Sequence, residues 1–417
     1  MNDKLKHNII IQYNDAEKID AIPHEGRRNL VLITPMLHQG GFERVCIETA
    51  RLMKDDYNIT IVIFSDKDIA FDVSGLNVVN LDVGVRDGKI AKVLNILKRR
   101  GRLKALEKRL HTDDVYSFGL SASIVNCAAA DMHSHKHIMR YVGLRGYADL
   151  EDKDAMKLYA AKADGIISCS QLIEDEFRST FGGKDNYVLY NPCDIEKIKK
   201  DAMKGSAEMP FPKGTDVIVS LGREVHLKDF PFMVGAFRYI HEKRPNTGLM
   251  IVGDGTYKVE KKLAEDLGIS DSVYFTGLKT EPYSYLKMGY IYLLTSFTEG
   301  FPNAMVEAMS LGIPVVSVNC KSGPAEILDD ASTYDSAETV YGKCGIICPE
   351  VTEEDFHNDD VMQKKERIFA DAALKLMSDR DMYDKYSEAS KERAMYFSQE
   401  SYIKNLKAIL EGADERR

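Results

Sequence analysis

The sequence lacks any apolar run close to the roughly 18 residues that a membrane-spanning helix requires. Its longest apolar stretch, from Leu30 to Leu37, is interrupted by Thr34 and Pro35. The first ten residues, MNDKLKHNII, also lack the apolar core of a secretion signal. The 7 cysteines are scattered, so we expect neither a disulfide framework nor a zinc site. These absences favour a cytoplasmic protein with reduced thiols.

The sequence also lacks an excess of positive charge. Its 56 Lys and Arg residues are outnumbered by 65 Asp and Glu residues, for a net charge of −9, so we expect no nucleic-acid partner. Residues 1–200 nevertheless carry a net charge of +1 and the remainder −10, which indicates different partners for the two halves. Residues 89–111 alone hold nine Lys and Arg side chains and one acid, Glu107.

Short apolar runs alternate with helical patterns along all 417 residues. Such near-continuous apolar strands are typical of parallel sheets that helices cover on both faces. The pattern therefore predicts two doubly wound α/β domains of the Rossmann-like type. We place them at residues 29–200 and 215–395, with a linker-like stretch at 191–216 and a final amphipathic helix within 396–417. Residues 1–28 are polar and fit either a tail or an extra edge strand.

The first strand of the second half leads directly into a basic loop. Gly222 and Arg223 follow this strand, and Lys228 comes five residues after Arg223. Open α/β sheets bind ligands at the carboxyl ends of their strands, and an arginine fork with a lysine charge suits a diphosphate. Taken alone, such a pair is more commonly two solvated basic side chains.

Glycines follow several other expected strands. They are Gly253 and Gly255, then Gly277, and, after the first strand of the chain, Gly40 and Gly41. Glycine lets a ligand approach the backbone closely, but it is equally common in plain turns. The loop at residues 40–41 departs from G-x-G-x-x-G, so it gives little support to a dinucleotide site.

The most specific pattern is Glu299-Gly300-Phe301-Pro302-Asn303, with Glu307 four residues further on. Pro302 fits the first position of a helix, and the amides at 300–303 would form a helix start that binds anions or hydroxyls. Glu307 lies about one turn into this helix, so both carboxylates can face one ligand. Because a carboxylate accepts hydrogen bonds from vicinal hydroxyls, the spacing suits a ribose and a hexose. Glu299 alone could simply be stabilised by the helix dipole.

These motifs occur in the order seen in retaining glycosyltransferases of family four, which the chain resembles over roughly residues 29–410. The matching segments are Glu-x7-Glu at 299 and 307, Gly-Arg…Lys at 222–228, Val-Gly-Asp-Gly at 252–255, Phe-x-Gly at 275–277 and Gly-Gly at 40–41. The resemblance implies the GT-B fold, two Rossmann-like domains facing across a cleft, with the donor on the second domain and the acceptor on the first. It also implies an interdomain hinge at Asn191-Pro192 and a last helix that returns to the first domain.

The resemblance assigns roles to individual residues. Arg223 and Lys228 grip the diphosphate, Glu307 the ribose, and Glu299 with the amides of Gly300, Phe301 and Pro302 the donor sugar. The implied catalytic residues are Arg223, Lys228 and Glu299. The remaining implied donor contacts are Gly40, Gly41, Arg145, Gly222, Gly253, Gly255, Gly277, Leu278 and Asn303.

One position departs from a common family pattern. Many members carry a histidine after the fifth strand of the first domain, whereas Arg145 stands there, and we interpret it as a phosphate or acceptor contact. His133, His135 and His137 precede this strand and invite a metal site, although three histidines on a loop are more often solvated. We expect no metal ion and no cofactor besides the donor substrate.

The implied reaction moves a hexose or N-acetylhexosamine from a nucleotide-diphosphate sugar, UDP-linked by family frequency, to a saccharide or lipid-linked saccharide in cell-surface glycan synthesis. No side chain is placed as a nucleophile, so we expect same-face attack, with the leaving phosphate taking the acceptor proton. A lipid-linked acceptor would suit a protein that lies on the inner face of the membrane. Residues 89–111 could then dock on anionic lipid through Ile90, Val93, Leu94 and Leu97, with Lys98, Arg99, Arg100 and Arg102 nearby. The alternative is a solvated surface helix.

Three alternative interpretations of the sequence remain open. A GT-A enzyme needs a metal-binding Asp-x-Asp, and Asp66-Lys67-Asp68 and Asp152-Lys153-Asp154 have that spelling. A nucleotide-sugar 2-epimerase would use the same fold without an acceptor. A non-catalytic nucleotide-sugar sensor is the third alternative, although the polar donor set is complete.

Overall fold

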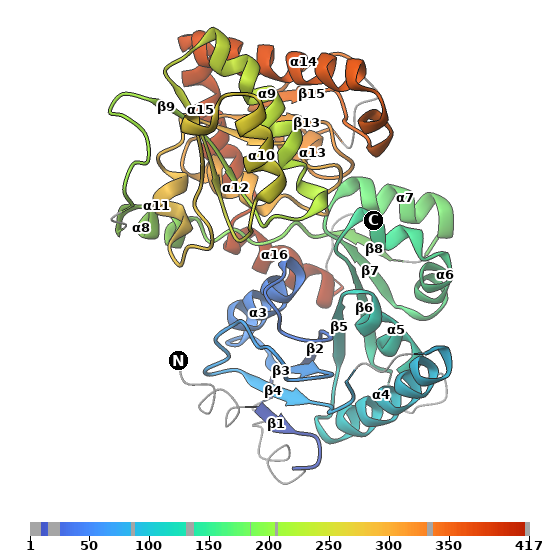
Figure 1. The fold of residues 1–417 in the computed structure, drawn as a ribbon. Coiled ribbons are helices and arrows are strands. Elements are labelled where there is room, and N and C mark those ends of the chain that lie inside the picture. The colour runs from blue at the N-terminus through green and yellow to red at the C-terminus, as the bar shows by residue number, and fades with distance from the viewer. Residues whose placement is uncertain are drawn as a thin grey trace. The chain divides into compact units, whose positions relative to one another are not determined.

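The computed structural model describes residues 10–15, 26–84, 88–130, 137–183, 185–204, 207–331 and 337–412. The chain divides into two compact units (Figure 1). The N-terminal unit comprises Met1–Pro192 together with Tyr402–Arg417, and the C-terminal unit comprises Cys193–Ser401. Each unit is built around its own parallel sheet.

The N-terminal unit contains an eight-stranded sheet in the order β1-β4-β3-β2-β5-β6-β7-β8. All of its strand pairs are parallel. Its strands are β1 Ile10–Gln12, β2 Asn29–Ile33, β3 Asn58–Ile63, β4 Asn77–Asn80, β5 Asp114–Phe118, β6 Met139–Leu144, β7 Gly165–Ser168 and β8 Asn186–Val188. The edge strand β1 pairs with β4. Residues 10–12 therefore form an extra edge strand, which is one of the two alternatives that we gave for the polar residues 1–28.

Helices cover both faces of this sheet, as the near-continuous apolar strands require. They are α3 Gly41–Met53, α4 Lys89–Arg109, α5 Leu120–Ala129, α6 Lys153–Lys162, α7 Gln171–Phe181 and the short η1 Tyr147–Glu151. The last helix, α16 Gln399–Leu410, adds its buried residues Tyr402, Leu406, Ile409 and Leu410 to the core beside α3. The Tyr402 hydroxyl lies 2.6 Å from Thr49 Oγ1. A second core packs α4 and α5 against β2–β5 through Leu103, Leu106 and Val125.

The C-terminal unit contains a seven-stranded sheet in the order β11-β10-β9-β12-β13-β15-β14. Only the last pair in this order, β14 with β15, is antiparallel among its strand pairings in the described ranges. Its strands are β9 Asp216–Leu221, β10 Thr247–Val252, β11 Val273–Phe275, β12 Ile291–Leu294, β13 Val315–Val318, β14 Val340–Tyr341 and β15 Gly345–Cys348.

Helices again cover both faces of the second sheet. They are α8 Ile195–Lys204, α9 Phe230–Lys243, α10 Lys258–Asp266, α11 Pro282–Leu286, α12 Asn303–Ser310, α13 Pro324–Asp329, α14 Asp359–Ser378 and α15 Arg380–Met395, with 3-10 turns η2 His226–Lys228, η3 Ser270–Ser272 and η4 Glu353–His357. Among the helices of the described ranges, none is long and apolar enough to cross a membrane.

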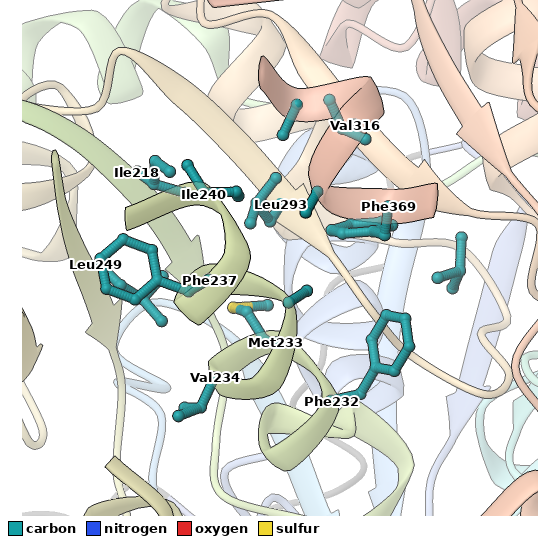
Figure 2. Packing of buried hydrophobic residues seen from close by; sticks show 14 of the residues in the cluster. Ile218, Phe232, Met233, Val234, Phe237, Ile240, Leu249, Leu293, Val316 and Phe369 are labelled. Carbon is teal, nitrogen blue, oxygen red and sulfur yellow. The ribbon is translucent and has the colours of Figure 1, made fainter. Parts of the chain in front are cut away.

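Helix α9 is the centre of the C-terminal core. Figure 2 shows Phe232, Met233 and Phe237 of this helix directed into a buried cluster with Leu293 of β12 and Phe369 of α14. The Phe232 and Phe369 rings meet edge to face with centroids 5.6 Å apart, an arrangement that aromatic quadrupoles favour. Because α9 is fixed between the sheet and α14, the loop that precedes it is held at a defined position.

The predicted fold class, two α/β domains with doubly wound parallel sheets, is confirmed. The linker-like stretch at 191–216 is more structured than its composition indicates, since it contains α8, which packs against α11 and α12 inside the C-terminal unit. Its charged residues lie on the solvent side, while Ile195, Ile198 and Ala202 are buried. The division between the units falls at Pro192 and Cys193.

Candidate active site

The strand order of the C-terminal unit reverses at β9. The chain passes from β9 to β10 and β11 on one side and then crosses to β12 and β13 on the other. The loops that leave the carboxyl ends of β9 and β12 therefore diverge at a topological switch point, the usual ligand position in open α/β sheets. The first of these loops carries Arg223 and Lys228, and the second carries Glu299.

The structure brings Lys228 and Glu299 together. Lys228 Nζ lies 2.6 Å from Glu299 Oε1, and the Ser296 hydroxyl donates to the same oxygen over 2.7 Å. A backbone hydrogen bond of 2.9 Å from Phe297 N to Leu227 O joins the two loops beside this pair. The side chains are 23% and 13% exposed, respectively, so the charges are partly shielded yet open to a ligand.

A second set of contacts fixes the backbone at Lys228. The Thr295 hydroxyl, at the end of β12, lies 2.9 Å from Lys228 O and 3.1 Å from Asp229 O. Asp229 then caps α9, because its Oδ1 accepts from Phe232 N over 3.2 Å. The Asp229 side chain is buried, and burial raises its pKa to about 7. The position of Lys228 is thus determined by β12 and α9 together.

The β10 loop passes very close to the β9 loop. A Cβ added to Gly253 would lie 1.8 Å from Gly222 O, and φ at Gly253 is +151°. Gly222 N donates to Val252 O over 2.9 Å, and Glu224 N donates to Asp254 O over 2.8 Å. Gly253 is therefore required for the packing of the loops, which is a structural reason for this glycine apart from any ligand.

Glu224 holds the same region together through its side chain. Its Oε2 accepts from Tyr257 N over 2.8 Å and from Thr256 N over 2.5 Å. These backbone donors, Tyr257 N first, lower the pKa of the Glu224 carboxyl. A Cβ at Gly255 would lie 2.4 Å from Glu224 Cβ, so Gly255 also serves local packing. Gly277 and Leu278 follow the neighbouring edge strand β11, where the Leu278 side chain is 59% exposed.

Arg223 differs from Lys228 in that no other residue of the described ranges is paired with its guanidinium. The side chain is exposed, and across the described part of the chain no hydrogen bond or ion pair to its guanidinium is found. It leaves the carboxyl end of β9 two residues after Leu221, in the same loop as Lys228. All the donor groups of Arg223 are consequently available to a ligand.

The Glu299–Asn303 segment is supported by the loop after β13. Glu299 N donates to Lys321 O over 3.1 Å, and the Ser322 hydroxyl donates to Gly300 O over 2.7 Å. A Cβ at Gly323 would lie 2.4 Å from Pro302 Cδ, so the two loops are in close contact. The segment at residues 321–323 was not among the expected site residues, because its role depends on a contact across the sheet.

Two expectations for this segment need correction. Helix α12 begins at Asn303 with Pro302 as its N-cap, so Pro302 is not the first helical residue. Proline has no backbone N–H, so an amide of Pro302 cannot hold a sugar. Asn303 N already donates to Phe301 O over 2.9 Å. The Phe301 side chain is buried and meets the Phe397 ring at 5.2 Å, which leaves its backbone as its possible ligand contact.

Glu307 lies deeper than Glu299. It is 3% exposed on α12, and its Oε1 accepts from the Tyr283 hydroxyl over 3.2 Å. Tyr283 belongs to α11, which the sequence did not single out. A ribose that reached Glu307 would therefore also meet this tyrosine.

The N-terminal unit has a switch point of its own, between β2 and β5. The Gly40–Gly41 loop follows β2, with Gly40 as the N-cap of α3, and Arg145 follows β6, one strand beyond β5. Both lie at the carboxyl edge of the sheet. The Arg145 guanidinium donates to Asn191 Oδ1 over 3.1 Å and lies over the Phe118 ring at 5.0 Å. Its Nε and Nη2 are buried without a hydrogen-bond partner in the described structure.

Residues from the two Asp-x-Asp patterns, which suggest metal sites, instead make structural contacts. Asp152 caps α6 by accepting from Ala155 N over 3.0 Å, and Asp66 Oδ2 accepts from Gln12 Nε2 over 3.0 Å. His133 and His135 lie outside the described residues, and His137 Nε2 is 2.7 Å from Asp164 Oδ1. Within the ranges that the structure covers, no group of three His, Cys, Asp or Glu residues is placed to hold a metal ion.

Comparison with known proteins indicates a family that this chain resembles. Residues 204–393, most of the C-terminal unit, match the family described as "Glycosyl transferases group 1". The fold resembles that of Anabaena HepE in complex with UDP and glucose, with a TM-score of 0.70, 18% identity, and coverage of 92% of this chain and 100% of that chain. An uncharacterised glycosyltransferase of Methanocaldococcus jannaschii is 32% identical over 270 residues, 62% of this chain and 66% of the relative. These matches support a GT-B glycosyltransferase.

A further relative of this chain carries a named activity. It is the N-acetylgalactosamine-N,N'-diacetylbacillosaminyl-diphospho-undecaprenol 4-alpha-N-acetylgalactosaminyltransferase of Campylobacter jejuni, 23% identical over 307 residues, 70% of this chain and 81% of the relative. The family match lies in the unit that holds the Lys228–Glu299 pair, so the site and the comparisons point to the same part of the chain.

Proposed function

We propose that this protein is a retaining glycosyltransferase of family four. It transfers a hexose or N-acetylhexosamine from a UDP-sugar to a saccharide or lipid-linked saccharide in cell-surface glycan synthesis. The observation that carries the proposal is the Lys228–Glu299 pair of 2.6 Å at the β9/β12 switch point. A cation for a diphosphate and a carboxylate for sugar hydroxyls lie side by side there, which is the arrangement that an activated sugar needs.

The diphosphate is assigned to Arg223 and Lys228. An ammonium group has three N–H donors, and Glu299 occupies one of those of Lys228, so two are free for phosphate oxygens. The exposed Arg223 guanidinium adds a planar fork that can bind two oxygens at once. As the sugar leaves, negative charge develops on the diphosphate, and both cations stabilise it.

The sugar and the ribose are assigned to the two carboxylates. The hydrogen bonds from Lys228 and Ser296 both end on Glu299 Oε1, so Oε2 can accept from hydroxyls of the donor sugar. The backbone of Gly300 and Phe301, next to the start of α12, lies beside this carboxylate. Glu307, held by Tyr283, receives the ribose hydroxyls.

The reaction proceeds with retention and without a protein nucleophile. The acceptor hydroxyl oxygen bonds to the anomeric carbon on the face from which the diphosphate departs, and the carbon–oxygen bond to the phosphate breaks. The acceptor proton passes to the departing phosphate, so that UDP is released and charge is balanced. The protein contributes positioning and the electrostatic field of Arg223 and Lys228, and the reaction needs no metal ion.

The nucleotide and the acceptor are proposed from relatives. HepE was crystallised with UDP and glucose, which supports UDP as the nucleotide. The name of the Campylobacter jejuni relative includes a sugar linked through diphosphate to undecaprenol, which supports a lipid-linked acceptor. In the N-terminal unit, Arg145 is the proposed contact for an anionic acceptor group, because buried N–H groups without a partner are costly and Nε and Nη2 of Arg145 are in that state.

The experiment that tests the function is donor turnover with a panel of UDP-sugars, with and without candidate acceptors. Release of UDP that requires an acceptor, with a product of the same anomeric configuration as the donor in NMR spectra, supports the proposal. Activity should persist in the presence of EDTA. Lys228→Met should abolish the activity, whereas Lys262→Met, at an exposed helix lysine paired with Asp266, should leave it unchanged. An epimerised UDP-sugar formed from donor alone, or an inverted product, would contradict the proposal.

A further inference from the structure

Helix α4 carries an apolar stripe that faces solvent. Ile90, Val93, Leu94 and Leu97 are 79%, 57%, 60% and 54% exposed, respectively. Their spacing of three and four residues places them on one side of the first two turns of the helix. Single exposed apolar side chains are ordinary on protein surfaces, but a contiguous group of this size marks an interaction site.

The exposed charges of helix α4 itself all have one sign. Lys89 and Lys98 are exposed on either side of the apolar residues, and Lys108 and Arg109 are exposed further along the helix. The only acid in α4, Glu107, is 3% exposed and lies 2.9 Å from Arg140, so it adds no negative charge to the outer face. The outer face of α4 is therefore apolar at its centre and cationic at its margins.

The arginines of the helix have a different role from the one expected. Arg99 Nε and Nη2 donate to Val83 O over 3.0 and 2.8 Å, and Arg100 Nε donates to Ala128 O over 2.7 Å. Arg102 Nη1 donates to Leu81 O. These side chains attach α4 to the loop after β4 and to the end of α5, so they are not the free basic side that the sequence indicated. They hold the stripe outward.

We propose that the outer face of α4, defined by Ile90, Val93, Leu94 and Leu97 with Lys89 and Lys98, docks on an anionic lipid bilayer. The apolar side chains enter the boundary between headgroups and acyl chains, and the lysines lie at the level of the lipid phosphates. Anionic lipid attracts each lysine near the surface, so charge and apolar burial act together. This interaction is separate from the donor site and does not depend on which sugar is transferred.

A bilayer fits this face better than a second copy of the chain. A symmetric dimer through α4 would place the stripe against itself and bring the lysines of one copy beside those of the other. No acid of α4 is exposed to compensate these like charges. An acidic protein partner could also satisfy the lysines, and in that case the full chain would not bind protein-free vesicles.

The test is co-sedimentation of the full chain with vesicles of phosphatidylcholine alone or mixed with phosphatidylglycerol. We expect binding to the mixed vesicles only, with weakening at high salt. Leu94→Ser with Leu97→Ser, and separately Lys89→Gln with Lys98→Gln, should each weaken binding by about tenfold or more. Because these side chains are exposed, both variants should keep the thermal unfolding temperature and the donor turnover in solution.

The matched control lies on α10, where Val259 is 63% exposed and Lys262 is exposed beside it. Val259→Ser with Lys262→Gln should bind mixed vesicles as the unchanged chain does. Equal binding of the α4 variants and the control would overturn the proposal, as would failure of the unchanged chain to bind the mixed vesicles. A dimer in solution that the Leu94→Ser and Leu97→Ser variant dissociates, without vesicle binding, would assign the face to self-association instead.

Discussion

Lys228 and Glu299 are separated by 71 positions in the sequence and form an ion pair of 2.6 Å at the carboxyl edge of the second sheet. Both side chains are mostly shielded from water, so the removal of either charge leaves the other in a poorly hydrated place. The pair therefore couples the position of the proposed diphosphate cation to that of the proposed sugar-binding carboxylate.

The first prediction concerns this coupling. Glu299→Gln keeps the shape of the side chain but removes its charge, so Lys228 loses its ionic partner and the sugar loses a strong acceptor. We expect kcat/KM to fall by about 100-fold. In a double-mutant cycle, Glu299→Gln together with Lys228→Met should cost less than the sum of the two single changes. Additive losses would show that the two side chains act independently.

The second prediction separates turnover from binding at Arg223. Its guanidinium has no protein partner in the described structure, so Arg223→Ala should not disturb the fold. If Arg223 mainly stabilises the leaving diphosphate, kcat should fall by about 100-fold while KM for the donor changes by less than about threefold. Steady-state kinetics with the preferred UDP-sugar gives both constants. Near-normal turnover of Arg223→Ala would remove Arg223 from the proposed mechanism.

The third prediction distinguishes close packing from backbone conformation at two glycines with positive φ. Gly253→Ala should destabilise the fold by more than about 3 kcal/mol, because its Cβ would lie 1.8 Å from Gly222 O. Gly268 has φ +69° with no heavy atom within 4 Å of an added Cβ, so Gly268→Ala should cost only about 1–2 kcal/mol. Denaturant unfolding measures both free energies. Equal losses would mean that the β9 and β10 loops can separate.

The fold was predictable because its strands are buried on both faces. Strands β2 (Asn-Leu-Val-Leu-Ile) and β12 (Ile-Tyr-Leu-Leu), for example, are short, largely apolar runs with almost every residue buried, and such runs are typical of a parallel sheet. Strands β8, β14 and β15 were not among the strands that we expected from the sequence. Strand β8 has only three residues. Strand β15 is a run of four residues, and among the described residues only the six-residue helix α13 and the two-residue strand β14 lie between it and β13.

Residues of the candidate site could be predicted only where a single loop contains a recognisable sequence motif. Glu299 and Lys228 each belong to a recognisable local motif, but Ser296, Tyr283 and Ser322 act through contacts between loops that are distant in sequence. The orientation of α4 could not be read from its sequence either. Its apolar residues would ordinarily face the core, whereas Arg99 and Asn95 face inward, where backbone carbonyls accept their N–H groups.

The fourth prediction concerns the pH dependence of stability and arises from Asp229, next to Lys228. Burial raises the pKa of this carboxyl from 3.8 to about 7, and the nearby acids Glu366 and Glu260 add to the shift. The pKa of Glu366 is likewise raised, to about 7, mainly by burial. Between pH 3.8, the ordinary pKa of the Asp229 carboxyl, and about 7, its pKa in the folded chain, the folded chain keeps this carboxyl protonated while the unfolded chain releases the proton. The free energy of unfolding therefore falls as the pH rises through this window.

Asp229→Asn tests this assignment, because asparagine keeps an oxygen that can accept from Phe232 N, as Asp229 Oδ1 does, but cannot ionise. The variant should be more stable than the unchanged chain at pH 8, by up to about 4 kcal/mol, and the difference should shrink as the pH is lowered toward 4. Urea unfolding at a series of pH values measures it, with Asp254→Asn, at an exposed position, as the matched control. Parallel curves for Asp229→Asn and the unchanged chain would show that Asp229 does not hold a proton near neutral pH in the folded state.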